Sequence, residues 1–353
     1  MARRAENRKK CLVLVLTLAL LLPLLGGCAP QARKMETTIF AMDTVMNLTF
    51  YGTDPEAALK GVQDELVAEL HSLESKLSSV DGDSEIYALN EQGHADLSPE
   101  TAEVLTQALA LCAATGGALD ITAYPAVEAW GFTTGEYRVP DREELEQLAT
   151  GIDYTLLEVD PQGGTADLAP GAAVDLGAVA KGYAGDRLAE MLRQTGIGSA
   201  LLDLGQSTIQ TVGVKPDGSP WRIGLQDPAG DGYLGVLELE EGAVGTSGGY
   251  QRYFEEDGVR YWHILDPDTA APARSGLASA TVVGASGLIC DGLSTALFVM
   301  GLEGSAQFWR EHPELEFEAI LVGDDGRIYV TAGLEGRFTL SEDHADREVT
   351  VLE

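Results

Sequence analysis

Cysteine is scarce in this sequence, with 4 among 353 residues. Cys11 and Cys28 belong to the N-terminal segment, which leaves two isolated cysteines in the rest of the chain. Two isolated cysteines form neither a metal centre nor a disulfide scaffold. Cys112 and Cys290 both lie in apolar stretches, so we expect buried structural thiols.

Basic residues are also few, with 23 Lys and Arg against 56 Asp and Glu. Affinity for nucleic acid comes from clustered Lys and Arg, so the composition disfavours nucleic-acid binding. The usual nucleotide motifs are absent too: no Gly-x-Gly-x-x-Gly follows a strand, and no Gly-x4-Gly-Lys-Ser/Thr occurs. An anionic nucleotide would therefore need a bound cation or a pocket of backbone amides.

The N-terminal segment has the pattern of a lipoprotein signal. Basic residues precede an apolar run from Cys11 to Leu25, which is shorter than the roughly 20 residues of a membrane-spanning helix. The run ends in Leu-Gly-Gly before Cys28. We predict a signal peptide over residues 1–27, lipidation of Cys28, a linker over 28–37 and a folded domain over 38–353. This places the protein on the extracytoplasmic face of the cell membrane. An ordinary signal peptide, or an N-terminal anchor with a chance cysteine, is the alternative.

Helices and strands are partly segregated along the rest of the chain, which favours an α+β fold of mixed sheets with packed helices. The length suits one large domain or two intimately joined lobes. Turn signals such as Asp257-Gly258 divide residues 199–285 into several short strands. The other expected strands cover 38–50, 317–323 and 327–332. The expected helices cover 55–77, 99–115, 179–193, 291–301 and 304–311.

Two glycine-containing segments could contact a ligand. In the segment 115–122, glycines end a helix and Asp120 follows, although a glycine cap with a solvated carboxylate is by itself the better explanation. In the segment 174–184, small residues form a strand-to-helix turn and free N–H groups begin the helix, where anions are favoured. Lys181 could meet a phosphate there. A tight turn with a surface lysine is the plainer explanation.

Two later segments carry polar side chains. His263 stands at the end of a strand before an Asp-Pro turn, where a lone histidine is commonly a packing residue. Asp291 and Thr295 are four residues apart in an expected helix and so share a face. Their oxygens suit Mg²⁺. The alternative is an N-terminal Asp favoured by the helix dipole and a Thr bonded to its own backbone.

In this order and spacing, the segments resemble the ApbE family, the FAD:protein FMN transferases. The resemblance runs from about Phe40 to Gly301. It rests on the following motifs: Ala41-Met42-Asp43-Thr44, Ser84-Glu85-Ile86-x-x-Leu89-Asn90, Gly116 to Thr122, Trp130-Gly131-Phe132, Asp175-Leu176-Gly177-x-x-Ala180-Lys181-Gly182-Tyr183, Thr246-Ser247-Gly248, His263-x-x-Asp266-Pro267-x-Thr269 and Asp291-x-x-Ser294-Thr295-Ala296.

The resemblance implies that FAD is cleaved and its FMN part passed to a Ser or Thr hydroxyl of an acceptor protein, with release of AMP and with Mg²⁺ required. It implies Mg²⁺ ligands at Ala178, Asp291 and Thr295, and an active-site histidine at His263. We hypothesise that His263 activates the acceptor hydroxyl. The residues implied to contact FAD are Met42, Ala118, Leu119, Asp120, Asp175, Lys181 and Leu265.

The tether implies acceptors among the extracytoplasmic domains of membrane redox proteins. Three alternatives remain open from the sequence. The first is an FAD pyrophosphatase that gives FMN and AMP, the second is a flavin-binding lipoprotein without chemistry, and the third is a substrate-capture lipoprotein for a transporter.

The chain departs from the family pattern at several positions. Asp43, Gln206 and Ala270 stand where the family usually has glycine, and Ala270 is expected to tolerate a positive φ poorly. Val80 replaces a tyrosine able to stack on the ligand, and Ala178 replaces another glycine. These changes put the affinity and shape of the pocket in question more than the reaction type.

Overall fold

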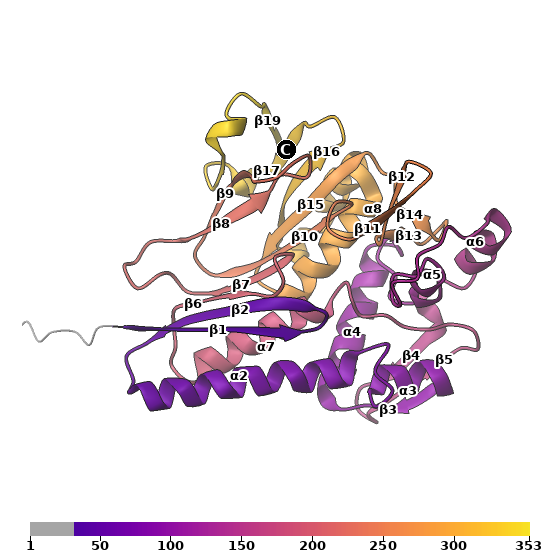
Figure 1. Cartoon of the computed structure of the whole chain (residues 1–353), viewed down its shortest axis with the longest axis horizontal. Helices are drawn as coiled ribbons and strands as arrows, with labels where there is room; N and C mark the ends of the chain where they lie inside the picture. Colours follow the sequence, from indigo (N-terminus) through magenta and orange to yellow (C-terminus); the bar gives the residue numbers. More distant parts are fainter. Residues whose placement is uncertain (1–31) are drawn as a thin grey trace, which may run out of the picture.

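A nine-stranded sheet forms the centre of the computed structural model, which describes residues 32–353 (Figure 1). Neighbouring strands are antiparallel throughout, except for the last pair, which is parallel. In sheet order the strands are β1 (Arg33–Ala41), β2 (Thr44–Gly52), β6 (Ala200–Asp203), β7 (Thr208–Val212), β10 (Gly242–Gly248), β15 (Leu277–Gly284), β16 (Glu318–Gly323), β17 (Ile328–Thr331) and β19 (Val349–Leu352).

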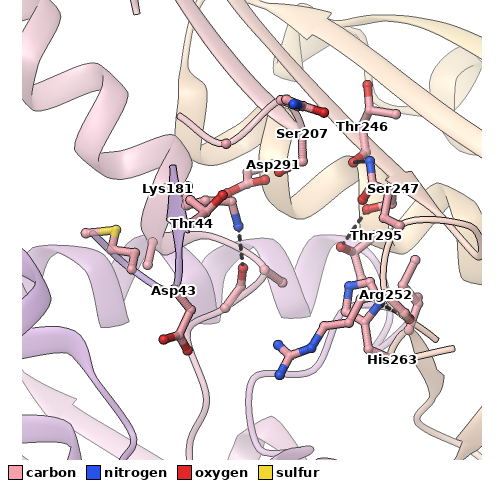
Figure 2. Close-up of a pocket in the computed structure, with 18 of the residues that line it drawn as sticks. Asp43, Thr44, Lys181, Ser207, Thr246, Ser247, Arg252, His263, Asp291 and Thr295 are labelled. Carbon is pink, nitrogen blue, oxygen red and sulfur yellow. Dashed lines mark hydrogen bonds between the residues drawn. The ribbon is translucent and has the colours of Figure 1, made fainter. Parts of the chain in front are cut away.

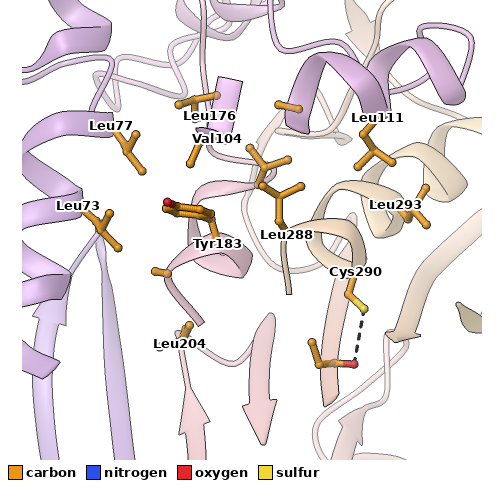
Figure 3. Packing of buried hydrophobic residues seen from close by; sticks show 14 of the residues in the cluster. Leu73, Leu77, Val104, Leu111, Leu176, Tyr183, Leu204, Leu288, Cys290 and Leu293 are labelled. Atoms are coloured by element: carbon orange, nitrogen blue, oxygen red, sulfur yellow. Dashed lines mark hydrogen bonds between the residues drawn. The ribbon is translucent and has the colours of Figure 1, made fainter. Parts of the chain in front are cut away.

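Four longer helices cover this sheet. α2 (Glu56–Leu77) packs on β1, α7 (Ala180–Gln194) on β7, and α8 (Gly287–Glu311) on β10 and β15. α4 (Pro99–Ala114) packs against α2 and α8. Their apolar faces meet in one core, where Tyr183 of α7 lies among leucines from α2 and α8 (Figure 3). The predicted α+β class is confirmed.

Smaller elements surround the central sheet. The β8–β9–β18 sheet stands beside its C-terminal strands, and α5 and α6 lie at the far end of the molecule from β1 (Figure 1). The remaining strands are β3 (His94–Asp96), β4 (Leu157–Asp160), β5 (Thr165–Leu168), β8 (Trp221–Gln226), β9 (Tyr233–Leu239), β11 (Tyr253–Glu256), β12 (Val259–Trp262), β13 (Leu265–Asp266), β14 (Ala271–Pro272) and β18 (Phe338–Leu340). The remaining helices are α3 (Glu85–Gln92), α5 (Tyr124–Ala129) and α6 (Arg142–Ala149).

The expected single strand over 38–50 is wrong, because the chain reverses within it. Met42 and Asp43, with φ of 49° and 58°, form the two-residue turn between β1 and β2. Such turns require positive φ at both central residues. β1 also begins at Arg33, so residues 33–37 of the expected linker belong to the sheet. The expected signal peptide and Cys28 lie outside the described residues.

The helix that carries the Asp291-Thr295 pair is longer than expected. α8 begins at Gly287, where Ser286 caps it by accepting a hydrogen bond from the N–H of Ile289, and it continues past a kink at Gly301 to Glu311. Asp291 therefore lies in the second turn rather than at the helix terminus. By length and composition alone α8 could cross a membrane, but it packs against β10, β15 and α7 as a core helix.

Candidate active site

One large cavity, of about 1460 Å³, opens beside α7, α8 and the β1–β2 turn. Every residue that the sequence assigns to FAD, Mg²⁺ or catalysis lines it. These residues are Met42, Ala118, Leu119, Asp120, Asp175, Ala178, Lys181, His263, Leu265, Asp291 and Thr295. The fold therefore brings segments more than two hundred residues apart to one place, while the role of each residue stays a prediction.

Asp291 is the most deeply placed carboxylate of the cavity, with 6% of its surface exposed. Its Oδ2 accepts a hydrogen bond from the backbone N–H of Gly182 at 2.9 Å, and its Oδ1 accepts one from the Thr208 hydroxyl at 3.0 Å. Burial raises the pKa of Asp291, while the charge of Lys181 and both hydrogen bonds act in the opposite direction. Removal of the carboxylate from water thus favours a nearby cation.

Two glycines allow the backbone to crowd around Asp291. A Cβ on Gly182 of α7 would lie 2.1 Å from the carbonyl oxygen of Gly287, and one on Gly245 of β10 would lie 2.4 Å from that of Cys290. Either contact is far below van der Waals distance. Glycine at both positions therefore lets α7 and β10 approach the first turns of α8, where Asp291 is held.

The predicted metal ligands supply oxygen donors only. Thr295 follows Asp291 by one helical turn and its Oγ1 lies 3.1 Å from the Oγ of Ser247. Within residues 32–353, no group of three or more His, Cys, Asp or Glu side chains could hold a metal. A buried carboxylate, a hydroxyl and the adjoining loop at Ala178 fit a hard cation that keeps water or phosphate oxygens as its other ligands. Each Asp291 oxygen also retains lone-pair capacity beyond its one hydrogen bond.

Lys181 brings positive charge to the part of the cavity that holds Asp175 and Asp291. It lies in the first turn of α7, and its Nζ is 3.5 Å from the carbonyl oxygen of Gly177. Asp175 stands beside that loop, where its carboxylate accepts hydrogen bonds from the Ser79 hydroxyl at 3.0 Å and the Gly177 N–H at 2.9 Å. Lys181 is thus placed next to both carboxylates, where an anionic ligand would add its own charge.

The carboxylate of Asp120 is already engaged by the chain. One oxygen accepts hydrogen bonds from the N–H and hydroxyl of Thr122 at 2.8 and 2.6 Å, and the other accepts one from the N–H of Tyr154 at 2.8 Å. Burial raises the pKa of Asp120, and these bonds oppose the rise. Asp120 therefore fixes the wall formed by Ala118 and Leu119.

His263 follows β12 and faces the cavity next to Arg252 (Figure 2). Its Nδ1 lies 3.1 Å from the backbone carbonyl oxygen of Arg252. A carbonyl can only accept, so Nδ1 carries the proton and Nε2 keeps its lone pair. Burial lowers the pKa of His263 to about 4, and the charges of Arg252 and Lys181 add to this against the hydrogen bond. The imidazole is therefore neutral near pH 7.

Two arginines that line the cavity were not predicted from the sequence. Arg252 approaches from the loop before β11 and donates to the carbonyl oxygen of Phe132, and Arg222 approaches from β8. With so few basic residues in the chain, an arginine between the Thr246-Ser247-Gly248 motif and His263 was a usable signal. Arg222 lies in no motif, so only the fold could place it.

The departures from the family pattern fall at strained or open positions. Asp43, Gln206 and Ala270 have φ of 58°, 66° and 54°, the left-handed region in which glycine is favoured. Ala270 is also fully buried, and its carbonyl accepts a hydrogen bond from Trp130 Nε1 at 2.8 Å. Val80 lines the cavity with 55% of its surface exposed, so the position offers no aromatic ring to a ligand.

Comparison with known proteins connects this geometry to one family. The family model described as the ApbE family matches residues 42–320. A relative from Vibrio cholerae named FAD:protein FMN transferase is 36% identical over 290 residues, which cover 79% of this chain and 85% of the relative. A relative of the same name from Treponema pallidum is 31% identical, over 88% of this chain and 91% of its own length.

Solved structures agree with the sequence comparison. The ApbE protein of Thermotoga maritima superposes with a TM-score of 0.80 at 30% identity, covering 86% of this chain and 99% of that one. The flavin transferase ApbE of Vibrio cholerae superposes with a TM-score of 0.77 at 30% identity, covering 87% and 100%.

The cavity and the fold are those of a flavin transferase, so this protein is an enzyme. The chain belongs to the ApbE family.

Proposed function

We propose that this enzyme transfers the FMN part of FAD to a Ser or Thr hydroxyl of an acceptor protein, releases AMP and requires Mg²⁺. The observation that carries the proposal is the convergence of a neutral histidine, a buried carboxylate and a lysine on one cavity. The names of the relatives support FAD as the flavin donor and a protein as the acceptor.

The chemistry assigned to the chain is a single displacement at phosphorus. The acceptor oxygen bonds to the phosphorus of the FMN moiety, the bridging P–O bond to AMP breaks, and the acceptor proton passes to Nε2 of His263. The Arg252 carbonyl supports this role, because it holds the proton of the free enzyme on Nδ1.

The metal is assigned to Asp291 and Thr295, with the backbone of Ala178 completing the protein ligands. When bound, Mg²⁺ supplies charge neutralisation at the pyrophosphate oxygens. Lys181 adds a fixed positive charge beside Asp291, which an acidic chain needs if it is to hold an anionic dinucleotide. Met42, Leu119 and Leu265 supply wall contacts.

The location is part of the proposal. With Cys28 lipidated, the enzyme sits on the extracytoplasmic face of the cell membrane, and its acceptors are extracytoplasmic domains of membrane redox proteins. Cys28→Ser is expected to release the protein from the membrane fraction. If the variant stays with the membrane, the lipid anchor at Cys28 is wrong.

One assay separates transfer from the other activities that the sequence left open. The full chain is incubated with FAD, Mg²⁺ and an extracytoplasmic flavoprotein domain that carries a candidate Thr. Flavin fluorescence on the acceptor band of a denaturing gel is the expected result, and a chelator should abolish it. Free FMN and AMP without labelled acceptor would indicate a pyrophosphatase, and intact FAD would indicate binding alone.

A further inference from the structure

Two buried hydroxyl groups and one half-buried one connect β10 to the helix that carries the proposed metal ligands. Ser247 of β10 is 8% exposed and Ser294 of α8 is 1% exposed. The Ser247 Oγ lies 2.9 Å from the Oγ of Ser294 and 3.1 Å from the Oγ1 of Thr295. The Ser294 Oγ in turn lies 2.7 Å from the backbone carbonyl oxygen of Asp291.

These distances fix the direction of every hydrogen bond in the chain. A hydroxyl has one proton to donate, and a carbonyl oxygen can only accept. Ser294 therefore donates to the carbonyl of Asp291, which leaves Ser247 as the donor to Ser294. Ser247 has then used its proton, so Thr295 must donate to Ser247. No other assignment makes all of these bonds.

The direction matters because Thr295 lines the cavity. By this assignment its proton points at Ser247, along the hydrogen bond dashed in Figure 2, and its lone pairs stay available to a ligand. A freely rotating hydroxyl would turn its proton toward a cation for part of the time, and the cation would be repelled. A hydroxyl held by a relay presents oxygen alone.

We propose that Ser247 and Ser294 are positioning residues, which form a one-way hydrogen-bond relay that keeps the lone pairs of Thr295 turned toward the metal. This inference rests on the metal site of the proposed function. The relay ends on the backbone carbonyl of Asp291, whose side chain is the other proposed ligand. Groups that orient metal ligands in this way typically contribute about 10- to 100-fold to metal affinity or activity.

A purely structural role predicts something different. Buried hydroxyls in a core must satisfy one another, and loss of one lowers stability wherever it lies. Ser305 provides the matched control, because it is also a serine of α8, is 1% exposed and donates to a helix carbonyl, that of Leu297, at 2.9 Å. Ser305 does not line the cavity and has no hydrogen bond to the relay.

The test measures ion binding rather than turnover. The full chain in detergent is titrated with Mn²⁺ as the probe, and free Mn²⁺ is followed by electron paramagnetic resonance. We expect Ser247→Ala and Ser294→Ala each to weaken Mn²⁺ binding about tenfold, with Ser305→Ala close to wild type. Unfolding temperatures of Ser294→Ala and Ser305→Ala should fall by similar amounts, so that the affinity loss is not a stability loss.

Ser294→Ala is the sharper variant, because Ser294 does not line the cavity. Without Ser294, the Ser247 proton turns to Thr295 and occupies one of its lone pairs. The double variant Ser247→Ala/Ser294→Ala should bind Mn²⁺ about as weakly as either single variant, since both changes break one relay. Two additive losses would overturn the relay.

Wild-type affinity in both single variants would overturn the relay while leaving the metal site intact. An equal loss in Ser305→Ala would overturn it as well, by showing a general effect of core hydroxyls. Failure of the wild-type chain itself to bind Mn²⁺ would instead remove the metal site of the proposed function, and the relay with it.

Discussion

The two ends of the cavity are built differently. At the α8 end, Asp291 and Thr295 project from a core helix. The absence of a side chain at Gly182 and Gly245 lets α7 and β10 approach this helix closely. At the other end, His263 and Arg252 lie next to the two-stranded β11–β12 hairpin, outside the central sheet. Under the proposed function, this difference means that the phosphates meet groups fixed in the core, whereas the acceptor protein meets His263 at the hairpin.

The largest effect is expected from Asp291→Asn at the α8 end of the cavity. Asn can still accept from Gly182 and donate to Thr208, so the fold should hold. Loss of the metal charge removes several kcal/mol of transition-state stabilisation, and FMN transfer should fall by about 10³-fold or more. Flavin fluorescence on the acceptor measures this.

Asp227→Asn is the control for Asp291→Asn, because Asp227 is also 6% exposed but pairs with His344 and Arg347 outside the cavity. It should lower the unfolding temperature and leave transfer intact. Equal loss of transfer in both variants would contradict the special place of Asp291.

The next largest effect is expected at the hairpin end of the cavity. His263→Ala should lower transfer by about 10²- to 10³-fold, the range for loss of a general base, while FAD binding stays near wild type. Quenching of flavin fluorescence reports binding, and the rate of acceptor labelling reports catalysis. His94→Ala, an exposed histidine of β3, is the control. Full transfer in His263→Ala would refute the assigned role.

The pH dependence of FMN transfer gives a second test of the role of His263. Because burial lowers the pKa of His263 to about 4, the free base predominates well below neutral pH. The acid limb of kcat/KM should therefore lie near pH 4 rather than near 6.5. His263 also binds a proton more readily when the chain is unfolded, so its contribution to stability decreases as pH falls from about 6.5 to 4. A limb that stays at pH 6.5 would contradict this environment.

A smaller effect on stability is expected where the backbone is crowded. Gly245→Ala puts a methyl group 2.4 Å from the Cys290 carbonyl oxygen, so β10 must move off α8. Overpacking of this kind costs about 1–3 kcal/mol in the free energy of unfolding, and Mn²⁺ binding should weaken with it. Gly61→Ala on α2 meets nothing within 4 Å and should instead stabilise the chain. Urea unfolding measures both.

The smallest effect is expected at an exposed strained residue. Gln206 has φ of 66° and is exposed where the chain passes from β6 to β7. Gln206→Gly relieves about 1–2 kcal/mol of strain in the left-handed backbone conformation. The greater flexibility of glycine in the unfolded chain offsets about half of this gain in the free energy of unfolding. A net gain of about 0.5 kcal/mol should appear in urea unfolding. Ala58→Gly, at an exposed position of α2, should instead lower the free energy of unfolding.

Local sequence signals predicted the long helices α2, α4 and α7, but the short helices α3, α5 and α6 were missed. The Ser98 cap and the glycines after Ala114 mark α4, and the period of the apolar residues marks α2 and α7. The reversal at Met42 and Asp43 was missed because Asp43 stands where glycine would have marked a turn. The start of α8 was missed because Gly287 reads as a breaker, although Ser286 caps the helix there.

The sequence allowed the residues of the candidate site to be predicted, but not the contacts between them. The four-residue spacing of Asp291 and Thr295 already placed them on one helix face. The partners of Asp291, however, lie on α7 and β7, and the state of His263 depends on the carbonyl of Arg252. Such contacts depend on packing between distant segments, which no local pattern encodes.

The early start of β1 limits how far the cavity can lie from Cys28. Five residue steps lead from Cys28 to Arg33 at the start of the strand, which is about 18 Å of extended chain at most. The nine residues of β1 then run about 30 Å, at roughly 3.3 Å each, to the turn that lines the cavity. If Cys28 carries a lipid, as proposed, the β1–β2 turn at the cavity lies no more than about 50 Å from the bilayer surface. Acceptor hydroxyls would have to be displayed at this height.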